Sequence, residues 1–184
     1  MVELMVVVAI IAILTTLAAP SFKQLIQSNS MSSAVNSFLA DMRYARSEST
    51  KRGSRVIMCR SDDPEAANPV CGAGSGPGTN GWVSGWIVFV DVNGDGTRTA
   101  SSTAATDPLL RIQSPITTVN KIVETSTPVK NKFQFTATGR LYLSSATSLQ
   151  FGGNPEFSNE VQRMVCVNVG GRARVAGDGY TSCP

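Results

Sequence analysis

The sequence of 184 residues contains no histidine. This absence excludes histidine-based catalytic triads, histidine metal ligands and the usual proton shuttle near neutral pH. No nucleophile motif takes their place, so the sequence predicts a protein that is not an enzyme and carries no cofactor. A secreted, calcium-dependent enzyme is the weakest alternative for the same reason.

Charged residues are scarce as well. They make up 16% of the chain, and 16 Lys and Arg against 13 Asp and Glu leave a net charge of only +3. Composition therefore excludes a strongly basic nucleic-acid-binding protein, and any nucleic-acid site must be local. The length fits one domain preceded by an anchor.

Polar side chains are absent from residues 4–14, within an N-terminal run that extends to Pro20. A helix that is apolar on every face must be buried all round, and this run approaches the roughly 20 residues that cross a bilayer. A signal peptide fits less well, because the start is acidic and has no Lys or Arg before Lys23. A core helix of a soluble domain would need a larger protein around it. We therefore expect residues 1–22 to be a transmembrane segment, with the unusual charge of Glu3 at its mouth.

Residues 23–53 continue the helical pattern in amphipathic form. Apolar residues recur among polar ones at helical spacing, namely Leu25, Val35, Phe38, Leu39 and Met42. Cations followed by Gly53 indicate the end of the helix. We expect one helix of about 50 residues, roughly 75 Å long at about 1.5 Å per residue, with a kink or local unwinding at Pro20.

Residues 54–184 are β-rich. Short runs of β-branched and aromatic residues predict strands at 56–58, 86–90, 133–135, 141–143 and 164–169. Segment 62–81 is rich in Gly and Pro, and segment 97–107 consists largely of Ser, Thr and Ala, so both are expected to be loops. The chain therefore divides into an N-terminal helix and a head.

The four cysteines, Cys59, Cys71, Cys166 and Cys183, lie outside the apolar run. They allow three pairings, and proximity favours Cys59 with Cys71 and Cys166 with Cys183. Neither pair has the spacing of zinc or thioredoxin-like sites; reduced buried cysteines are an alternative, and a metal site is a weaker one. Disulfides would place the head in an oxidising compartment such as the periplasm.

Residues 91–97 read D-V-N-G-D-G-T. Oxygen ligands at Asp91, Asn93 and Asp95, with a glycine for the sharp turn, imitate the first half of a calcium loop. The position that requires a bidentate Glu holds Ser102, so the ligand set is incomplete. Asn-Gly and Asp-Gly are also ordinary turn dipeptides. We predict a simple turn without metal, and calcium is the weaker alternative.

Gly170 and Gly171 separate residues 164–169 from residues 172–175, which predicts a tight hairpin. Arg172 and Arg174 would project from one strand face, about 6.6 Å apart at about 3.3 Å rise per residue. That separation resembles the spacing of successive phosphates, and arginine forks suit phosphate oxygens. A disulfide between the last two cysteines would brace the hairpin. The alternative is a solvated strand face with two ordinary arginines.

Three large aromatic residues, Trp82, Trp86 and Phe89, allow a second nucleic-acid hypothesis. Such side chains can stack on the bases of single strands. Aromatic residues in a β domain more often belong to the core, which is what we expect here.

Residues 2–14, V-E-L-M-V-V-V-A-I-I-A-I-L, followed by A-P-S-F at 19–22, resemble the N-terminal signature of type IV pilins and type II secretion pseudopilins. Segments 45–48, 51–53, 85–91, 93–94, 139–140 and 171–174, with Cys59 and Phe135, resemble the GspH/FimT branch of minor pilins and pseudopilins. The resemblance covers nearly the whole chain. It implies the type IV pilin fold, an α+β architecture in which a long N-terminal helix packs on a C-terminal antiparallel β domain.

In that family a leader is removed before a phenylalanine whose amine becomes methylated, and a glutamate lies at the fifth mature position, which Glu3 matches. Met1 stands where the family usually has leucine, and the leader, cleavage site and phenylalanine are not in the sequence. A trimmed chain or a misplaced start codon would explain this difference.

The resemblance also implies functions for named residues. Glu3 would meet the N-terminal amine of a neighbouring subunit during filament assembly, and Gly171, Arg172 and Arg174 match a G-R-x-R motif associated with DNA capture in FimT-type pilins. We therefore expect a minor pilin at or near the tip of a type IV pilus-like filament, binding DNA independently of sequence for uptake in natural transformation. The alternative is a structural or priming minor pilin, or a type II secretion pseudopilin, that binds no DNA.

The expected partners are other pilin subunits, the inner membrane before assembly, and DNA. The expected location is the bacterial inner membrane, spanned once, with a periplasmic head. After assembly the subunit would lie in an extracellular pilus.

Overall fold

The computed structural model describes residues 2–100, 106–125, 130–142, 146–153, 155–178 and 183, and for residues 16–21 it describes the backbone alone. Within these residues one long helix precedes short strands and 3-10 turns. The elements are α1 (Val2–Arg52), β1 (Arg55–Arg60), η1 (Pro77–Thr79), η2 (Trp82–Ser84), β2 (Trp86–Asp91), β3 (Leu109–Gln113), β4 (Ile122–Glu124), β5 (Lys132–Phe135), β6 (Thr147–Phe151), β7 (Arg163–Val167) and β8 (Ala173–Asp178).

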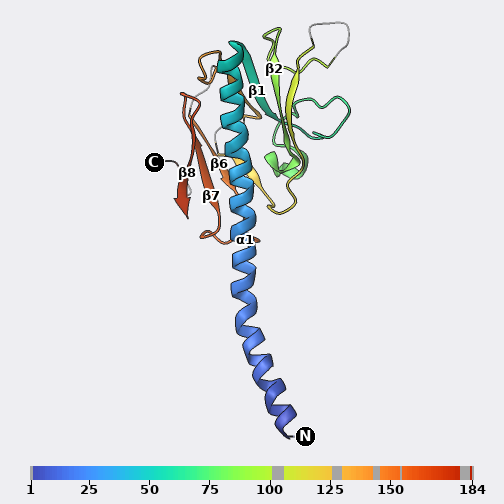
Figure 1. Cartoon of the computed structure of the whole chain (residues 1–184), viewed down its shortest axis with the longest axis vertical. Helices are drawn as coiled ribbons and strands as arrows, with labels where there is room; N and C mark the ends of the chain where they lie inside the picture. The colour runs from blue at the N-terminus through green and yellow to red at the C-terminus, as the bar shows by residue number, and fades with distance from the viewer. Residues whose placement is uncertain are drawn as a thin grey trace.

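Helix α1 runs past the head and extends far beyond it at the N-terminus (Figure 1). Its 51 residues confirm the predicted single long helix. The helix ends where the sequence predicts, since Gly53 follows Arg52 and the amide of Ser54 donates to the carbonyl of Ser49 at 3.3 Å. The helical backbone is continuous through Pro20, so the predicted local unwinding is wrong, and the ribbon bends gently below the head (Figure 1).

The C-terminal half of α1 carries one buried stripe, formed by Met31, Ala34, Val35, Phe38, Leu39, Met42 and Ala45. The ring of Phe38 lies at the centre of the core and meets four other rings edge to face, at centroid separations of 5.4–6.0 Å: Trp82, Trp86, Phe133 and Phe151. Leu25 belongs to the same sequence pattern but is 56% exposed. Burial of apolar helix residues by the head therefore begins near Met31. Gln24 and Gln27 already donate side-chain hydrogen bonds to Glu160 and to the carbonyl of Glu156.

The described head contains two four-stranded antiparallel sheets. Sheet A has the order β3-β2-β1-β5, and sheet B has the order β4-β6-β7-β8. Helix α1 contacts strands of both sheets, and Figure 1 shows β1 and β2 on one side of it and β6, β7 and β8 on the other. The main core lies where the helix meets the two sheets. The predicted α+β architecture is confirmed.

The second face of sheet A is also covered. Ile57, Cys59, Ile87 and Phe89 form a separate buried cluster there, and a disulfide joins Cys59 to Cys71 at its edge. The cover consists of two loops, one that precedes β2 in the chain and one that follows it. This arrangement explains why every residue of β2 is buried.

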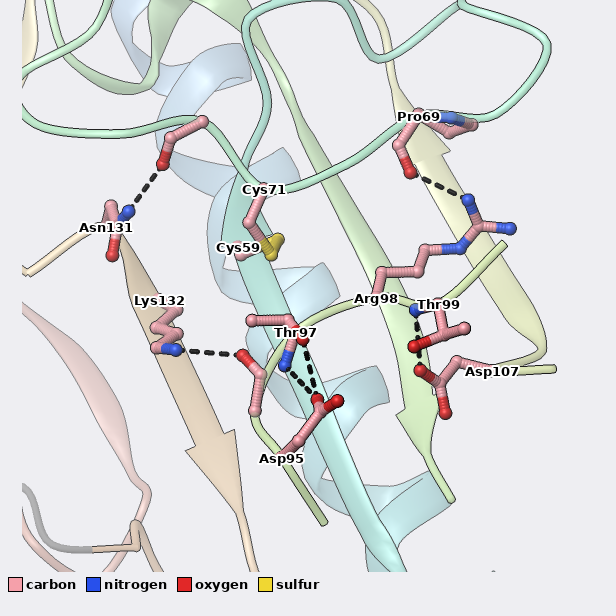
Figure 2. Close-up of a disulfide and its surroundings, with 12 residues drawn as sticks. Cys59, Pro69, Cys71, Asp95, Thr97, Arg98, Thr99, Asp107, Asn131 and Lys132 are labelled. Carbon is pink, nitrogen blue, oxygen red and sulfur yellow. Dashed lines mark hydrogen bonds between the residues drawn. A yellow bond between two sulfur atoms is a disulfide. The ribbon is translucent and has the colours of Figure 1, made fainter. Parts of the chain in front are cut away.

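Figure 2 shows how the two loops are tied down around the disulfide. Arg98 donates to the carbonyl of Pro69 at 2.7 Å, which joins the loops to each other. The side-chain amide of Asn131 donates to the carbonyl of Gly72, and Lys132 donates to that of Gly96 at 2.8 Å. Both loops are thus attached to the sheet as well as to one another.

A buried arginine organises the longer loop. Arg60, the last residue of β1, is only 1% exposed, and its guanidinium pairs with Asp62 and donates to the carbonyl of Ala73 at 2.5 Å. Loop 62–81 is irregular apart from η1, as expected. Its shape follows from satisfying a cation that has no access to water.

The strand prediction is correct in part. Residues 56–58, 86–90, 133–135 and 164–167 lie in β1, β2, β5 and β7. The strand predicted at 141–143 is wrong for the residues described, because Leu141 forms only an isolated bridge to Phe135 and residue 143 lies outside the described part. Of the predicted loop 97–107, residues 101–105 also lie outside it.

Candidate functional site

The hairpin predicted around Gly170 and Gly171 joins β7 to β8. The amide of Gly171 donates to the carbonyl of Asn168 at 2.9 Å, and the amide of Asn168 donates to the carbonyl of Arg172 at 3.0 Å. The Asn168 side chain accepts the amide of Arg172 at 3.0 Å. The turn is therefore fixed by its own hydrogen bonds before any packing is considered.

Gly171 also fixes the position of the turn in the head. It is buried, with φ of 74°, and a Cβ built on it would lie 2.5 Å from the carbonyl oxygen of Gly139. A Cβ on Gly139 would in turn lie 3.1 Å from side-chain atoms of Arg46 and Thr50 on α1. The hairpin turn therefore packs against the turn at Gly139, and that turn packs against helix α1.

Arg172 and Arg174 are both exposed, on the side of β8 opposite to that contact. Cys166 lies directly opposite Arg174 in register, and Ser148 lies directly opposite Cys166. These three side chains share the outer face of sheet B, because residues in register point the same way. A disulfide joins Cys166 to Cys183, beside Arg174.

The two arginines line one groove of about 670 Å³ on this face. The disulfide, Asn168, Thr125 and Ser148 also line it, and none of its described lining residues is Asp or Glu. Among the described residues no carboxylate pairs with the Arg172 guanidinium. The groove therefore combines concave shape with positive charge, which suits an anion.

Sequence reasoning missed the opposite wall of this groove. Thr125 follows the three-residue strand β4, and Ser148 lies in β6, whose sequence T-S-L-Q-F carries few β-branched or aromatic residues. The alternation of apolar Leu149 and Phe151 with polar Ser148 and Gln150 is the sequence signal that could have identified this strand.

Glu3 lies in the first turn of α1 and is exposed. A carboxylate is favourable there because the amide ends of a helix are electropositive. The large apolar side chains of residues 2–14 are 52–75% exposed. Within the described part of the chain, no helical stretch combines the length and the apolar character needed to cross a bilayer.

The calcium-like segment forms a turn whose carboxylates bind protein donors. Asp91 accepts the amides of Gly94 and Gly96 at 2.9 and 3.2 Å, and it pairs with Arg55 at 3.3 Å. Asp95 accepts both the amide and the hydroxyl of Thr97 at 2.7 Å (Figure 2). These bonds hold the pKa of Asp95 below its usual value.

The third oxygen ligand expected there, Asn93, donates its side-chain amide to Asp95 at 2.7 Å. The Asn-Gly and Asp-Gly dipeptides therefore serve the turn itself. In the part of the chain that is described, no three His, Cys, Asp or Glu residues meet in a way that could hold a metal ion.

The aromatic platform for single strands does not exist. Trp82, Trp86 and Phe89 are at most 2% exposed and belong to the two core clusters. The indole of Trp86 donates to Asp41 of α1 at 2.8 Å, and Asp41 also pairs with Arg111 at 2.7 Å. These residues fasten the helix to sheet A.

One buried acid stands out that the sequence did not indicate. Glu124, at the end of β4, is 7% exposed, and burial raises its pKa to about 7. The hydroxyl of Thr147 donates to it at 2.9 Å, and the amide of Lys130 also donates to it. These bonds oppose the effect of burial without cancelling it.

Comparisons with known proteins add to this geometry. A family model described as "Type II transport protein GspH" matches residues 34–171. Two crystal forms of the type IV minor pilin FimU of Pseudomonas aeruginosa (strain PAO1) have a similar fold. One is 19% identical, with a TM-score of 0.53 over 83% of this chain and 96% of that one. The other is 15% identical, with a TM-score of 0.51 over 81% and 99%. A search of curated proteins finds no match.

Proposed function

Because the chain belongs to the GspH family of type II transport proteins, we propose that it is a minor subunit of a type IV pilus-like filament, placed at or near the tip, which binds DNA for uptake. The family is one of minor pilins and pseudopilins, whose role is structural. The observation that carries the DNA part is that Arg172 and Arg174 line one groove, whose described lining residues include no Asp or Glu. The proposed role is not enzymatic.

The exposed N-terminal half of α1 supports the assembly part of the proposal. An apolar surface of this size on a single helix is stable only when lipid or other helices cover it. We propose that residues 1–22 lie in the inner membrane before assembly and among neighbouring helices in the filament core afterwards. The two disulfides suit a periplasmic head, since disulfides persist in oxidising compartments.

Glu3 would set the register of assembly. A carboxylate carried into an apolar bundle is costly unless a cation pairs with it. The N-terminal amine of a neighbouring subunit is the cation proposed here. A subunit that enters without this pair would bury an uncompensated charge, so the pair favours one position over others.

The chemistry of the groove supports the DNA part. Two arginines whose backbone positions are about 6.6 Å apart along a strand can each extend a guanidinium group to one of two successive phosphates. Contacts of this kind reach the backbone and not the bases, so binding would be independent of sequence and weakened by salt. Gly171 contributes through position, because it is buried under the turn and not exposed in the groove.

A second candidate is a type II secretion pseudopilin, or a structural or priming pilin, that binds no DNA. The description of the matching family as a type II transport protein favours it. In that case Arg172 and Arg174 are ordinary cations of a solvated face.

A fluorescence-polarisation titration separates the two candidates. The full chain, in non-ionic detergent, is titrated against labelled duplex DNA at several salt concentrations. Arg172→Ala with Arg174→Ala should weaken binding and make the plot of log affinity against log salt shallower by about two, because about two phosphate contacts are lost. Arg43→Ala with Arg140→Ala removes the same charge from exposed positions outside the groove and is the matched control.

The DNA proposal fails if the wild type does not bind at low salt, or if both double variants bind equally well. The assembly proposal has its own test. Glu3→Ala should be depleted from sheared filaments, whereas Glu65→Ala, an exposed acid of the head, should be incorporated normally. Equal incorporation of the two variants would contradict the role of Glu3.

A further inference from the structure

The groove has two chemically different walls. Arg172, directly before the edge strand β8, and Arg174, within it, form one of them. The other lies across sheet B, where Thr125 and Ser148 carry hydroxyl groups. The disulfide of Cys166 separates the walls.

The register fixes how far apart the walls are. Ser148, Cys166 and Arg174 form a row across three neighbouring strands. Two spacings of about 4.8 Å separate β6 from β8, so the hydroxyl wall stands roughly 10 Å from the arginine wall. A sugar–phosphate backbone that passes over the disulfide would have the hydroxyl groups on one side of it and the guanidinium groups on the other.

The hydroxyl groups of Thr125 and Ser148 can together donate one hydrogen bond to a ligand. The amide of Thr125 donates to the carbonyl of Ser148 at 2.9 Å, which holds the end of β4 against β6. The two hydroxyl oxygens lie 2.5 Å apart, so one of their two hydrogens serves the bond between them. When Ser148 is the donor, the hydrogen of Thr125 has one longer alternative among the described residues, the carbonyl oxygen of Ser148 at 3.3 Å. A phosphate oxygen is a stronger acceptor, because it is charged.

We propose that Thr125 and Ser148 form a second, neutral wall of the phosphate-binding groove, so that one DNA backbone is held between hydroxyl groups and guanidinium groups. This inference rests on the proposed DNA binding and adds two contact residues to it. The hydroxyl wall determines on which side of the arginines the DNA backbone lies. The arginines alone would hold the backbone along β8 without determining that side. The test must therefore separate a neutral contact from a charged one.

The salt dependence of DNA binding distinguishes a neutral contact from a charged one. Thr125→Val with Ser148→Ala removes both hydroxyl groups with little change of shape and none of charge. Duplex affinity should fall by about threefold to tenfold, as expected for neutral hydrogen bonds, while the salt slope stays that of the wild type. Arg172→Ala with Arg174→Ala should instead change the slope.

A matched control exists elsewhere on the head. Thr136 and Thr138 also form a hydroxyl pair, at 2.9 Å, on a turn that does not line the groove. Thr136→Val with Thr138→Val should bind DNA like the wild type. If the groove variant also binds like the wild type while the arginine variant is weakened, the hydroxyl wall is refuted and the proposed function stands. If the wild type itself binds no DNA, both are refuted.

A charged substitution covers the case in which the groove variant fails to fold. Circular dichroism of each variant identifies that case. Ser148→Lys places a cation on the hydroxyl wall, so it should tighten duplex binding and make the salt slope steeper by about one. An unchanged slope would show that no phosphate reaches this wall and would overturn the inference.

Discussion

Replacing Gly171 with alanine should destabilise the head, because two independent costs meet at this position. The backbone has φ of 74°, a left-handed conformation in which an L side chain is strained. The new Cβ would also lie 2.5 Å from the carbonyl oxygen of Gly139 and 3.1 Å from the ring of Phe135. The first of these neighbours is a backbone atom, so no rotamer change relieves the contact.

The magnitude follows from adding the two costs. The left-handed conformation costs about 1–2 kcal/mol for a residue other than glycine. Overpacking in a well-packed interior costs about 1–3 kcal/mol more. Together they predict a loss of about 2–5 kcal/mol, which lowers the unfolding midpoint by roughly 4–20 °C for a chain of this size.

Gly170 provides the control from the neighbouring position. Among the described residues, a Cβ there would meet only side-chain atoms of Asn168, the nearest at 3.2 Å, and Gly170 does not have a positive φ. Gly170→Ala should therefore change the free energy of unfolding by less than about 1 kcal/mol. Thermal unfolding followed by circular dichroism, with both disulfides intact, compares the variants. If Gly171→Ala melts together with Gly170→Ala, the packing account of the turn is wrong.

Three further predictions concern stability and binding. The raised pKa of Glu124, about 7 against a usual 4.5, means that the folded chain binds a proton more tightly, so this contribution is complete below pH 4.5 and is lost as pH rises through 7. Glu124→Gln should flatten the stability curve from pH 5 to about 7.5 in urea unfolding, and an unchanged slope would contradict the assignment. Asp41→Ala leaves the buried indole N–H of Trp86 without its acceptor and should cost about 1–3 kcal/mol in thermal unfolding; a loss below about 0.5 kcal/mol would argue against that bond. Replacing Cys166 and Cys183 by alanine should lower stability by about 2–4 kcal/mol and weaken duplex binding, and DNA affinity equal to that of the wild type would mean that the disulfide does not brace the groove.

The sequence predicts helices and strands correctly where the periodicity of apolar residues is strong. The apolar stripe through Phe38 and the glycine after Arg52 determined the helix and its end, and the β-branched runs identified β1 and β2. It failed for β3, β4 and β6, because these strands are short or carry polar residues on their outer faces. Their stability comes from partners distant in sequence, which local composition does not reveal.

In the candidate site, too, the sequence predicts the local geometry but not the contacts between distant segments. The spacing of Arg172 and Arg174 was enough to place both on one face of a strand, since that depends on local geometry. Nothing in the sequence connects Thr125 with Ser148 or either of them with Arg174. These residues meet only through the order of strands in sheet B, where β4, β6, β7 and β8 lie side by side.

The packing of the Gly171 turn on the Gly139 turn connects the groove to helix α1 by a short series of contacts. The turn that precedes Arg172 packs on Gly139, and Gly139 packs against Arg46 and Thr50 of α1. These contacts hold the start of the groove at a fixed place relative to the helix axis. Any movement that reorients α1 would therefore reorient the groove with it, so the packing of this helix against its neighbours would decide the direction in which the groove faces.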